Sequence, residues 1–194
     1  MPVLTPNTDP RAAQSTLILG GVRSGKSRLA ERLAMASGLP VTYVATALAG
    51  DDEMRARIEA HRQRRPQDWR LVEEPRHLAN TLKSVCASGH CVIVECLTLW
   101  LTNLLCADDQ ALLSRELDAF RECSPTLPGQ ILYVSNEVNM GVIPAHPLSR
   151  NYCDLAGGLH QTLATHCECV ILTVAGLPLV VKGAPLSLNP ERNP

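Results

Sequence analysis

This sequence has few aromatic residues, a net charge close to zero and no long apolar run. Phe, Trp and Tyr together make up 3% of the 194 residues, which is too few for a surface that stacks unpaired bases. The formal net charge is −1, whereas a protein that binds nucleic acid through its phosphates usually carries a marked basic excess. No apolar run reaches the length of about 18 residues that a membrane-spanning helix needs. We therefore expect neither nucleic-acid binding nor membrane insertion.

The eight cysteines form no C-x-x-C pair, which is the spacing typical of zinc sites and redox-active dithiols. Most of them are predicted to be small core residues, because cysteine is among the most buried residue types. Cys167-Glu168-Cys169 could chelate a metal, but no second pair lies nearby. The beginning of the chain, MPVLTPNTDPRAAQS, lacks the apolar stretch of a secretory signal. The expected compartment is the cytoplasm, which reduced thiols fit.

Short apolar runs alternate with helix-like stretches along the chain. The strand candidates are 16–19, 41–45, 69–72, 91–95, 131–135 and 169–174, and the helix candidates are 26–37, 51–64, 75–87, 109–123 and 152–167. Alternating strands and helices pair in parallel through right-handed crossovers, so the sequence predicts an α/β fold with a mostly parallel sheet flanked by helices. We expect one domain at 16–184, between a flexible arm at 1–15 and a flexible tail at 185–194.

The clearest motif lies between the first predicted strand and the first predicted helix. It reads Gly20-Gly21-Val22-Arg23-Ser24-Gly25-Lys26-Ser27 and fits G-x-x-x-x-G-K-[ST] completely. Glycines let the backbone N–H groups close around phosphate oxygens, and the helix N-terminus adds its dipole. Lys26 is expected to reach the outer phosphates and Ser27 to ligate Mg²⁺. A chance match in a glycine-rich turn would not have both the strand and the helix in place, so we predict the nucleotide site of a P-loop NTPase.

A P-loop protein also needs an acid near the phosphates to hold the magnesium ion. The run 91–95, CVIVE, has the pattern of a buried strand that ends in a carboxylate, Glu95. In a parallel sheet this end lies on the phosphate side. Glu95 is therefore the predicted magnesium partner, although Asp is more usual there and an ordinary acid at the end of a strand is the alternative.

The segment IEAHRQRRP, residues 58–66, puts one histidine among several arginines. In a helix over 51–64, Met54, Ile58 and His61 fall at i, i+4 and i+7, so His61 is expected to point toward the body of the protein. A lone histidine on such a face is more often a core residue with satisfied hydrogen bonds. A basic patch and a solvated helix face are further alternatives.

Three arginines favour a functional role for His61 over a core role, because Arg57, Arg64 and Arg65 share or border the same face of the helix. A core does not accept three cations without an anion, and the phosphate chain of a bound nucleotide is such an anion. A neutral histidine nitrogen can attack phosphorus and form a covalent intermediate, with arginines offsetting the charge on the phosphoryl oxygens. His61 is thus a candidate nucleophile, and attack on the α-phosphorus would release pyrophosphate.

Several longer segments occur together and in order: GGVRSGKS (20–27), YVATALAGDDEMRARIEAHRQRRP (43–66), WRLVEE (69–74), VECLTLWLTNLL (94–105), SNEVNMGVIP (135–144) and DLAG (154–157). In these the chain resembles the bifunctional adenosylcobinamide kinase/adenosylcobinamide-phosphate guanylyltransferase family of cobalamin biosynthesis. The resemblance implies a RecA-like P-loop fold, usually in a homotrimer. It also implies phosphorylation of adenosylcobinamide with ATP or GTP, followed by transfer of GMP from GTP to give adenosyl-GDP-cobinamide and pyrophosphate.

The resemblance also assigns roles to individual residues. His61 falls on the family's guanylylated histidine. Beyond the P-loop, the implied nucleotide-binding residues are Ala45, Thr46, Ala47, Arg62, Gln63, Arg64, Arg65, Glu73 and Glu95. Glu73 is the candidate for reading guanine, because a carboxylate can accept from both N1–H and N2–H; a solvated acid at a strand end is the alternative. Asn136 and Glu137 are expected to position the corrinoid, its phosphate or the magnesium ion, unless they belong to a structural turn.

The predicted helix after Arg150 departs from the family's pattern, F-R-D-x-x-G-x-x-N-Q. Cys153 stands at its arginine and His160 at its asparagine. If these positions support subunit contacts or the corrinoid, the trimer or the kinase step is affected. Two other functions remain: a single-activity P-loop kinase of another small molecule, and a RecA-like ATPase that binds nucleic acid or protein. The near-neutral charge and scarce aromatics argue against the latter.

Overall fold

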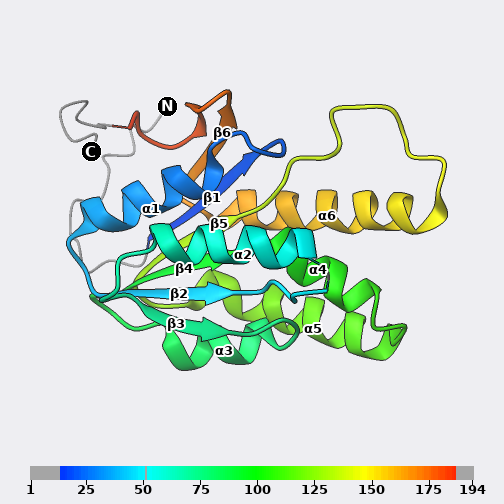
Figure 1. Ribbon diagram of the computed structural model, residues 1–194, viewed down its shortest axis with the longest axis horizontal. Helices are drawn as coiled ribbons and strands as arrows, with labels where there is room; N and C mark the ends of the chain where they lie inside the picture. The colour runs from blue at the N-terminus through cyan, green and yellow to red at the C-terminus, as the bar shows by residue number, and fades with distance from the viewer. Residues whose placement is uncertain (1–13, 51, 187–194) are drawn as a thin grey trace.

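A seven-stranded β-sheet runs through the middle of the molecule, with helices on both of its faces (Figure 1). The computed structural model describes residues 14–50 and 52–186, and the side chains of Glu53, Met54, Arg57 and His61 are not among those described. Most of the predicted arm at 1–15 and of the predicted tail at 185–194 lies outside the described residues.

Strands and helices alternate along the chain, as the sequence predicted. In chain order the elements are β1 (Gln14–Gly20), α1 (Lys26–Ser37), β2 (Val41–Ala45), α2 (Asp52–Arg64), β3 (Arg70–Glu73), α3 (Leu78–Val85), β4 (Cys91–Glu95), α4 (Leu97–Leu105), α5 (Gln110–Cys123), the short 3₁₀ helix η1 (Ser124–Thr126), β5 (Gln130–Val134), α6 (Pro147–His166), β6 (Cys169–Val174) and β7 (Leu177–Lys182). The bounds of β2, β4, β6 and α1 match their predictions.

The strand order in the sheet is β3-β2-β4-β5-β1-β6-β7. Neighbouring strands are parallel, except that β6 and β7 are antiparallel. The first six strands therefore end at one edge, which is the edge where ligands bind in open α/β sheets. The predicted α/β fold with a mostly parallel sheet flanked by helices is confirmed.

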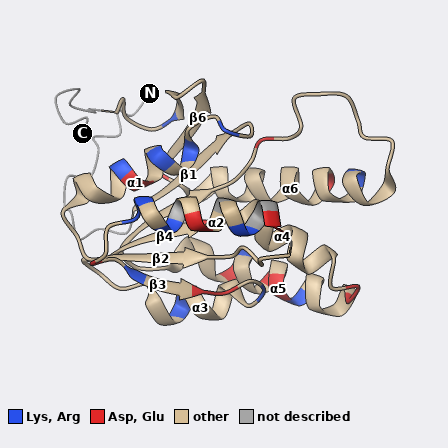
Figure 2. Cartoon of the chain, viewed as in Figure 1, with Lys and Arg blue, Asp and Glu red and all other residues tan. Residues whose placement is uncertain are grey.

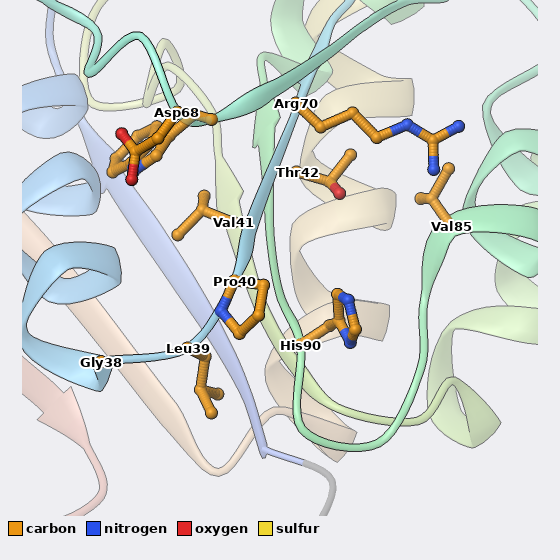
Figure 3. A pocket seen from close by; sticks show the side chains of 10 residues that line it. Gly38, Leu39, Pro40, Val41, Thr42, Asp68, Arg70, Val85 and His90 are labelled. Atoms are coloured by element: carbon orange, nitrogen blue, oxygen red, sulfur yellow. The ribbon is translucent and has the colours of Figure 1, made fainter.

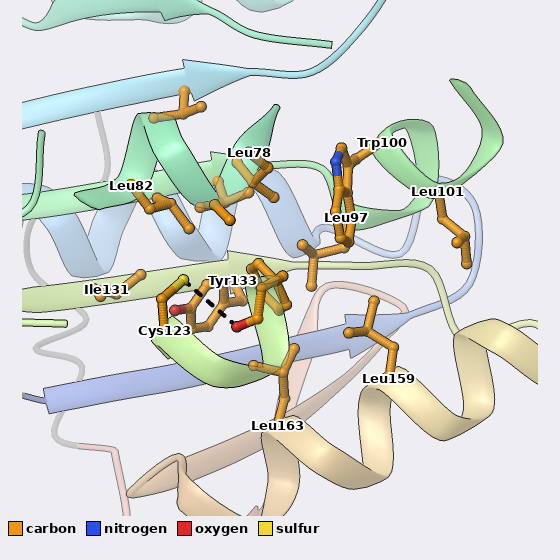
Figure 4. Packing of buried hydrophobic residues seen from close by; sticks show 14 of the residues in the cluster. Leu78, Leu82, Leu97, Trp100, Leu101, Cys123, Ile131, Tyr133, Leu159 and Leu163 are labelled. Atoms are coloured by element: carbon orange, nitrogen blue, oxygen red, sulfur yellow. Dashed lines mark hydrogen bonds between the residues drawn. The ribbon is translucent and has the colours of Figure 1, made fainter. Parts of the chain in front are cut away.

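Successive strand residues face opposite sides of the sheet, and so they build two separate hydrophobic cores. Leu17 packs with residues of α3, α4, α5 and α6, whereas its neighbour Ile18 packs with residues of α1. The larger core holds Trp100, Phe120 and Tyr133, with ring centroids 5.1 Å apart for Trp100–Phe120 and 5.7 Å for Phe120–Tyr133 (Figure 4). Three of the six aromatic residues of the chain are therefore buried in this core, and Tyr43 and Trp69 are buried in the other.

Helix α4 was not predicted, although its sequence has a helical period. It buries residues at i, i+3, i+4 and i+7, namely Leu97, Trp100, Leu101 and Leu104. The helix begins two residues after the end of the apolar strand β4, so strand and helix form one apolar stretch in the sequence, and the prediction did not separate them. α4 matters for the site because it packs beside the carboxyl ends of β4 and β5.

Strand β7 was also missed, because the prediction stopped at β6. Ala175 and Gly176 have φ angles of 51° and 82° and form a two-residue turn that reverses the chain into an antiparallel hairpin.

Other boundaries need correction. β1 begins at Gln14, inside the predicted arm. α6 begins at Pro147 and not at 152, because proline suits the first turn of a helix, where no N–H partner is needed. Within the described part of the chain, no helix is both long and apolar enough to span a bilayer.

Candidate nucleotide and transfer site

The residues singled out from the sequence gather at the carboxyl edge of the sheet. The P-loop follows β1, residues 45–47 lie at the end of β2, Glu73 ends β3 and Glu95 ends β4. β5 lies between β1 and β4, so the segment that follows it leaves the sheet between the P-loop and Glu95. That segment contains Asn136 and Glu137. The order of the strands therefore brings together residues that are far apart in the sequence.

The P-loop backbone takes a shape that depends on glycine. The φ angles are 154° at Gly20, 57° at Arg23 and 99° at Gly25. A Cβ atom on Gly20 would lie 2.4 Å from the carbonyl oxygen of Thr173, so no other residue fits there. The loop passes directly into the N-terminus of α1, which is the arrangement that binds phosphate through backbone N–H groups.

Two hydrogen bonds from neighbouring segments fix the loop. The Glu137 N–H donates to the Gly20 carbonyl at 2.9 Å, and the Gly176 N–H donates to the Ser24 carbonyl at 2.8 Å. The first bond comes from the segment after β5 and the second from the β6–β7 turn. The phosphate loop is therefore held in place by the sheet on both of its sides.

Lys26 is buried, and its ammonium group turns back onto the loop. Its Nζ donates to the Gly21 carbonyl at 2.7 Å. Burial lowers the pKa of Lys26, while the nearby Glu95 and Cys96 act in the opposite direction. The structure thus holds the Lys26 ammonium group against the phosphate loop.

Ser27 and Glu95 meet across the loop and β4, where the Ser27 hydroxyl donates to Glu95 Oε1 at 2.8 Å. Burial raises the pKa of Glu95 to about 7, and the Ser27 hydrogen bond opposes that rise. The second carboxylate oxygen, Oε2, is buried and has no hydrogen-bond partner among the described residues. A hydroxyl beside a carboxylate with an unpaired oxygen fits Mg²⁺, which typically takes one or two carboxylates and completes its shell with water and substrate phosphates.

No group of three or more His, Cys, Asp or Glu side chains within residues 14–50 and 52–186 is arranged to hold a metal ion. The eight cysteines are free, and four of them are buried: Cys86, Cys91, Cys123 and Cys167. A metal at the P-loop would therefore need nucleotide oxygens as well as Ser27 and Glu95.

Thr46 is buried, and its polar groups are used within the protein. Its hydroxyl donates to the Cys96 carbonyl at 2.7 Å and accepts from the Cys96 N–H at 2.8 Å. The Asn103 amide on α4 donates to the Thr46 carbonyl at 2.7 Å. These bonds join the ends of β2 and β4 to α4 and so position Glu95. The Thr46 side chain, which was predicted to contact the nucleotide, therefore stabilises the backbone that positions Glu95.

Two adjacent acids at the end of β3 differ in their surroundings. The Glu74 carboxylate accepts from the N–H groups of Arg76 and His77 at 2.9 Å and 2.7 Å, just before α3. Glu73 is exposed and pairs in register with Ala45 on β2. Glu74 therefore stabilises the turn before α3, whereas Glu73 is accessible to a ligand at this edge of the sheet.

Helix α2 carries the histidine segment, and two arginines attach its C-terminal end to the body of the protein. Arg64 lies 3.8 Å from the Glu31 carboxylate on α1, and the Arg65 guanidinium lies 5.2 Å from the ring centre of Tyr43 on β2. Burial raises the pKa of Glu31, and Arg64 opposes that rise. Figure 2 shows basic residues on both α1 and α2. Glu31 and Tyr43 were not singled out from the sequence, since neither belongs to a motif.

His61 lies within α2, one helical turn before Arg65. Its side chain is outside the described residues, so its inward direction stays a prediction. Arg62 and Gln63 are exposed, and Gln63 donates to Glu59 at 3.1 Å along the helix. The structure therefore places the backbone of the whole histidine segment but tests no role of these side chains.

No sequence pattern predicted the contacts that surround Asn136 and Glu137. The Asn136 N–H donates to the Thr98 hydroxyl on α4 at 2.7 Å. Nε2 of His160 on α6 lies 2.8 Å from the Ser135 hydroxyl. The sequence singled out His160 only because it departs from the family's pattern. These pairs join segments 25 or more residues apart, so no local pattern predicts them.

A separate hollow of about 520 Å³ lies at the opposite edge of the sheet, by the amino ends of β2 and β3 (Figure 3). Its lining includes Pro40, Thr42, Asp68, Arg70 and His90. None of the residues predicted from the sequence contributes to it. The hollow is therefore not part of the candidate site.

Comparison with known proteins agrees with this architecture. A sequence model of the family described as CobU, cobinamide kinase/cobinamide phosphate guanyltransferase, matches residues 16–181. The bifunctional adenosylcobalamin biosynthesis protein CobP of Pseudomonas aeruginosa is 60% identical over 170 residues, which cover 88% of this chain and 98% of that protein. The bifunctional protein CobU of Escherichia coli is 38% identical over 179 residues, covering 86% and 98%. A solved structure of the Pyrococcus horikoshii protein PH0250 has a TM-score of 0.55 at 10% identity, covering 94% of this chain and 95% of that one, and is similar in fold alone.

Proposed function

Because the chain belongs to the cobinamide kinase/cobinamide phosphate guanyltransferase family, we propose that it carries out both reactions on one P-loop domain. It phosphorylates the aminopropanol hydroxyl of adenosylcobinamide with ATP or GTP. It then transfers GMP from GTP to that phosphate, giving adenosyl-GDP-cobinamide and pyrophosphate in cobalamin nucleotide-loop assembly. The observation that carries the proposal is the 2.8 Å contact between Ser27 and Glu95 at the P-loop of a chain with this family match.

In the phosphorylation step, residues 20–27 bind the triphosphate through backbone N–H groups and through Lys26. Ser27 and Glu95 would hold Mg²⁺. Bound Mg²⁺ neutralises charge on the outer phosphates. The acceptor oxygen bonds to the γ-phosphorus, and the bond from that phosphorus to the nucleoside diphosphate breaks.

In the transfer step, a nitrogen of His61 attacks the α-phosphorus of GTP and pyrophosphate leaves, so that a guanylyl-histidine remains. An oxygen of adenosylcobinamide phosphate then attacks the same phosphorus, the P–N bond breaks and the histidine is restored. Arg62, Gln63, Arg64 and Arg65 follow His61 in and just after the last turn of α2. Their charges and donors offset the charge that develops on the phosphoryl oxygens.

The base of the nucleotide lies near the ends of β2 and β3 in this proposal. The exposed carboxylate of Glu73 accepts from N1–H and N2–H of guanine, which adenine does not offer in that arrangement. Ala45 and Ala47 contribute backbone groups, and Thr46 contributes by holding that backbone in place. This set makes the transfer step specific for GTP.

We also propose that the protein acts as a homotrimer in the cytoplasm. The β6–β7 hairpin forms one edge of the sheet and exposes a row of apolar side chains: Val174, Leu177, Leu179 and Val181. An apolar edge strand favours pairing with another chain, and further copies of this chain would cover it. The eight free cysteines suit a reducing compartment.

The test is incubation with α-³²P-GTP and Mg²⁺ in the absence of corrinoid. The protein should become labelled in an acid-labile, alkali-stable form, with release of pyrophosphate. His61→Ala should not be labelled, whereas the matched control His90→Ala, at the opposite edge of the sheet, should label like the unchanged protein. Equal labelling of His61→Ala would refute the covalent step. A single-activity kinase would instead pass label only from the γ-position to an added acceptor.

A further inference from the structure

Glu137 lies beside the phosphate loop, and its carboxylate is held from two sides. Its backbone N–H donates to the carbonyl of Gly20, the first residue of the loop, at 2.9 Å. Its Oε1 accepts from the Asn139 N–H at 2.7 Å, and its Oε2 lies 4.0 Å from Nδ1 of His160. The side chain is 15% exposed, so it can still be reached by a substrate. The Glu137 backbone is thus fixed to the phosphate loop, and its carboxylate is oriented by Asn139 and lies near His160.

His160 is buried, and a chain of hydroxyl groups orients its ring. Its Nε2 lies 2.8 Å from Ser135 Oγ, which lies 3.4 Å from Thr98 Oγ1. Thr98 Oγ1 also accepts from the Asn136 N–H at 2.7 Å. We infer that the neutral ring carries its proton on Nδ1, because that nitrogen faces the Glu137 carboxylate, and that Nε2 accepts from the Ser135 hydroxyl.

The surroundings keep the ring of His160 neutral. Burial lowers the pKa of His160, and Glu137 opposes that effect. Tyr152 on the same helix also interacts with Glu137, and burial raises the pKa of Tyr152 to about 12. A contact of 4.0 Å is too long for a direct hydrogen bond, so the Nδ1–H dipole acts on the Glu137 carboxylate through its electrostatic field.

The two carboxylates of the site have different surroundings. Glu95 is bonded to Ser27 and has a buried, unpaired second oxygen, which suits a metal, whereas Glu137 accepts from a backbone N–H and lies near His160 without a hydrogen bond to it. Phosphorylation of a hydroxyl requires a group that takes its proton, and a positioned carboxylate commonly does so. Pairs of acids in unlike surroundings often divide such roles.

We propose that Glu137 takes the proton of the hydroxyl that is phosphorylated, and that His160 is the positioning residue that holds the Glu137 carboxylate toward it. The inference rests on the proposed kinase activity. As the acceptor oxygen bonds to the γ-phosphorus, its proton passes to a Glu137 oxygen and the nucleoside diphosphate leaves. The proton is then released to water.

The test uses two separate assays: phosphorylation of adenosylcobinamide from γ-labelled nucleotide, and labelling of His61 from α-labelled GTP without corrinoid. Glu137→Gln should lower kcat for phosphorylation about 100-fold or more, and should lower His61 labelling far less. His160→Ala and Ser135→Ala should each lower kcat about tenfold, and the double variant should lose little more, because the two residues act in one chain.

The kinetic profile, kcat against KM, separates positioning from a general structural role. In His160→Ala the kcat for phosphorylation should fall while the KM values for nucleotide and adenosylcobinamide stay in place, because the carboxylate loses the ring that orients it and the binding groups are unchanged. The control is Leu163→Val, which removes a methylene group from a buried leucine on the same helix and should leave the profile in place. If His160→Ala does not fold, His160→Asn supplies the comparison.

Four results would overturn the inference. Glu137→Gln could retain phosphorylation within about threefold, which would exclude it as the proton acceptor. The His160→Ala profile could coincide with that of Leu163→Val, which would leave His160 a packing role. Equal losses in both assays would indicate a general defect of the site. An unchanged protein that labels His61 but does not phosphorylate adenosylcobinamide would contradict the kinase activity itself, and this inference with it.

Discussion

The two halves of the candidate site lie at one edge of the sheet but are held in different ways. At the P-loop, the side chains of Lys26 and Ser27 make hydrogen bonds of 2.7 Å and 2.8 Å in partly buried surroundings. At the end of α2, the contacts include an ion pair at 3.8 Å from Arg64 and a cation–π contact at 5.2 Å from Arg65. The first half is part of the core, and the second is attached to the surface of the core.

This difference indicates which half of the site is sensitive to salt. Buried hydrogen bonds between fixed elements persist as long as the sheet is folded, and they preorganise the phosphate site. Ion pairs of partly exposed arginines contribute little and are weakened further by salt. We therefore expect the phosphate-binding half to depend on folding alone, and the position of α2 to depend on charge.

The largest effect is expected from Lys26→Ala, which removes the buried ammonium group from the P-loop. Phosphorylation should fall by about 1000-fold, because a preorganised cation at the phosphates is lost. Lys83→Ala, an exposed lysine on α3, is the control and should stay within about twofold. If one triphosphate site serves both halves, labelling of His61 should fall as well. Labelling that survives in Lys26→Ala would show that the two halves bind separate nucleotides.

A smaller effect, on stability, is expected from Glu95→Gln. Burial raises the pKa of Glu95 to about 7 in the folded state, above the value near 4.5 in the unfolded chain. The folded state therefore binds the extra proton, and the stability that this supplies is lost as pH rises from about 4.5 through 7. Without Mg²⁺ and nucleotide, Glu95→Gln should be more stable than the unchanged protein at pH 8 by about 3 kcal/mol, and nearly equal at pH 4.

Urea unfolding in EDTA at the two pH values measures this difference. The comparison between the two proteins cancels titrating groups that do not interact with Glu95. Glu31 does interact with Glu95 and contributes to its raised pKa, so Glu31→Gln should be measured in parallel. Phosphorylation should be lost in Glu95→Gln despite the gain in stability. A variant with the same pH dependence as the unchanged protein would mean that Glu95 is ionised at no cost in the folded state.

The smallest effects are expected at the end of α2. Arg64→Gln and Arg65→Gln should each lower the free energy of unfolding by about 1 kcal/mol or less, because one ion pair or one cation–π contact is lost. Arg62→Gln, at an exposed position on the same turn, is the matched control. The Arg64 effect should shrink at high salt and the Arg65 effect less so, since Tyr43 is buried. Losses of several kcal/mol would show that α2 is held as firmly as the P-loop.

Much of the fold and part of the site could be predicted because the signals were local. Apolar runs with intervening helical stretches indicated the parallel sheet, and the bounds of four elements were right. The spacing of Gly20, Gly25 and Lys26 describes a loop whose geometry is set within eight residues. Glu95 could be named because it ends a buried run. α4 and β7 were missed where two elements followed one another without a clear break.

The sequence by itself determined that this chain has a P-loop, an acid at the end of a buried strand and a histidine among arginines. Only the tertiary structure decided that Ser27 meets Glu95, that Thr46 supports the frame and that His160 lies behind Glu137. The physical reason is the strand order, in which β5 separates β1 from β4. Contacts between residues 25 to 68 positions apart depend on which strands become neighbours, and no local pattern contains that information.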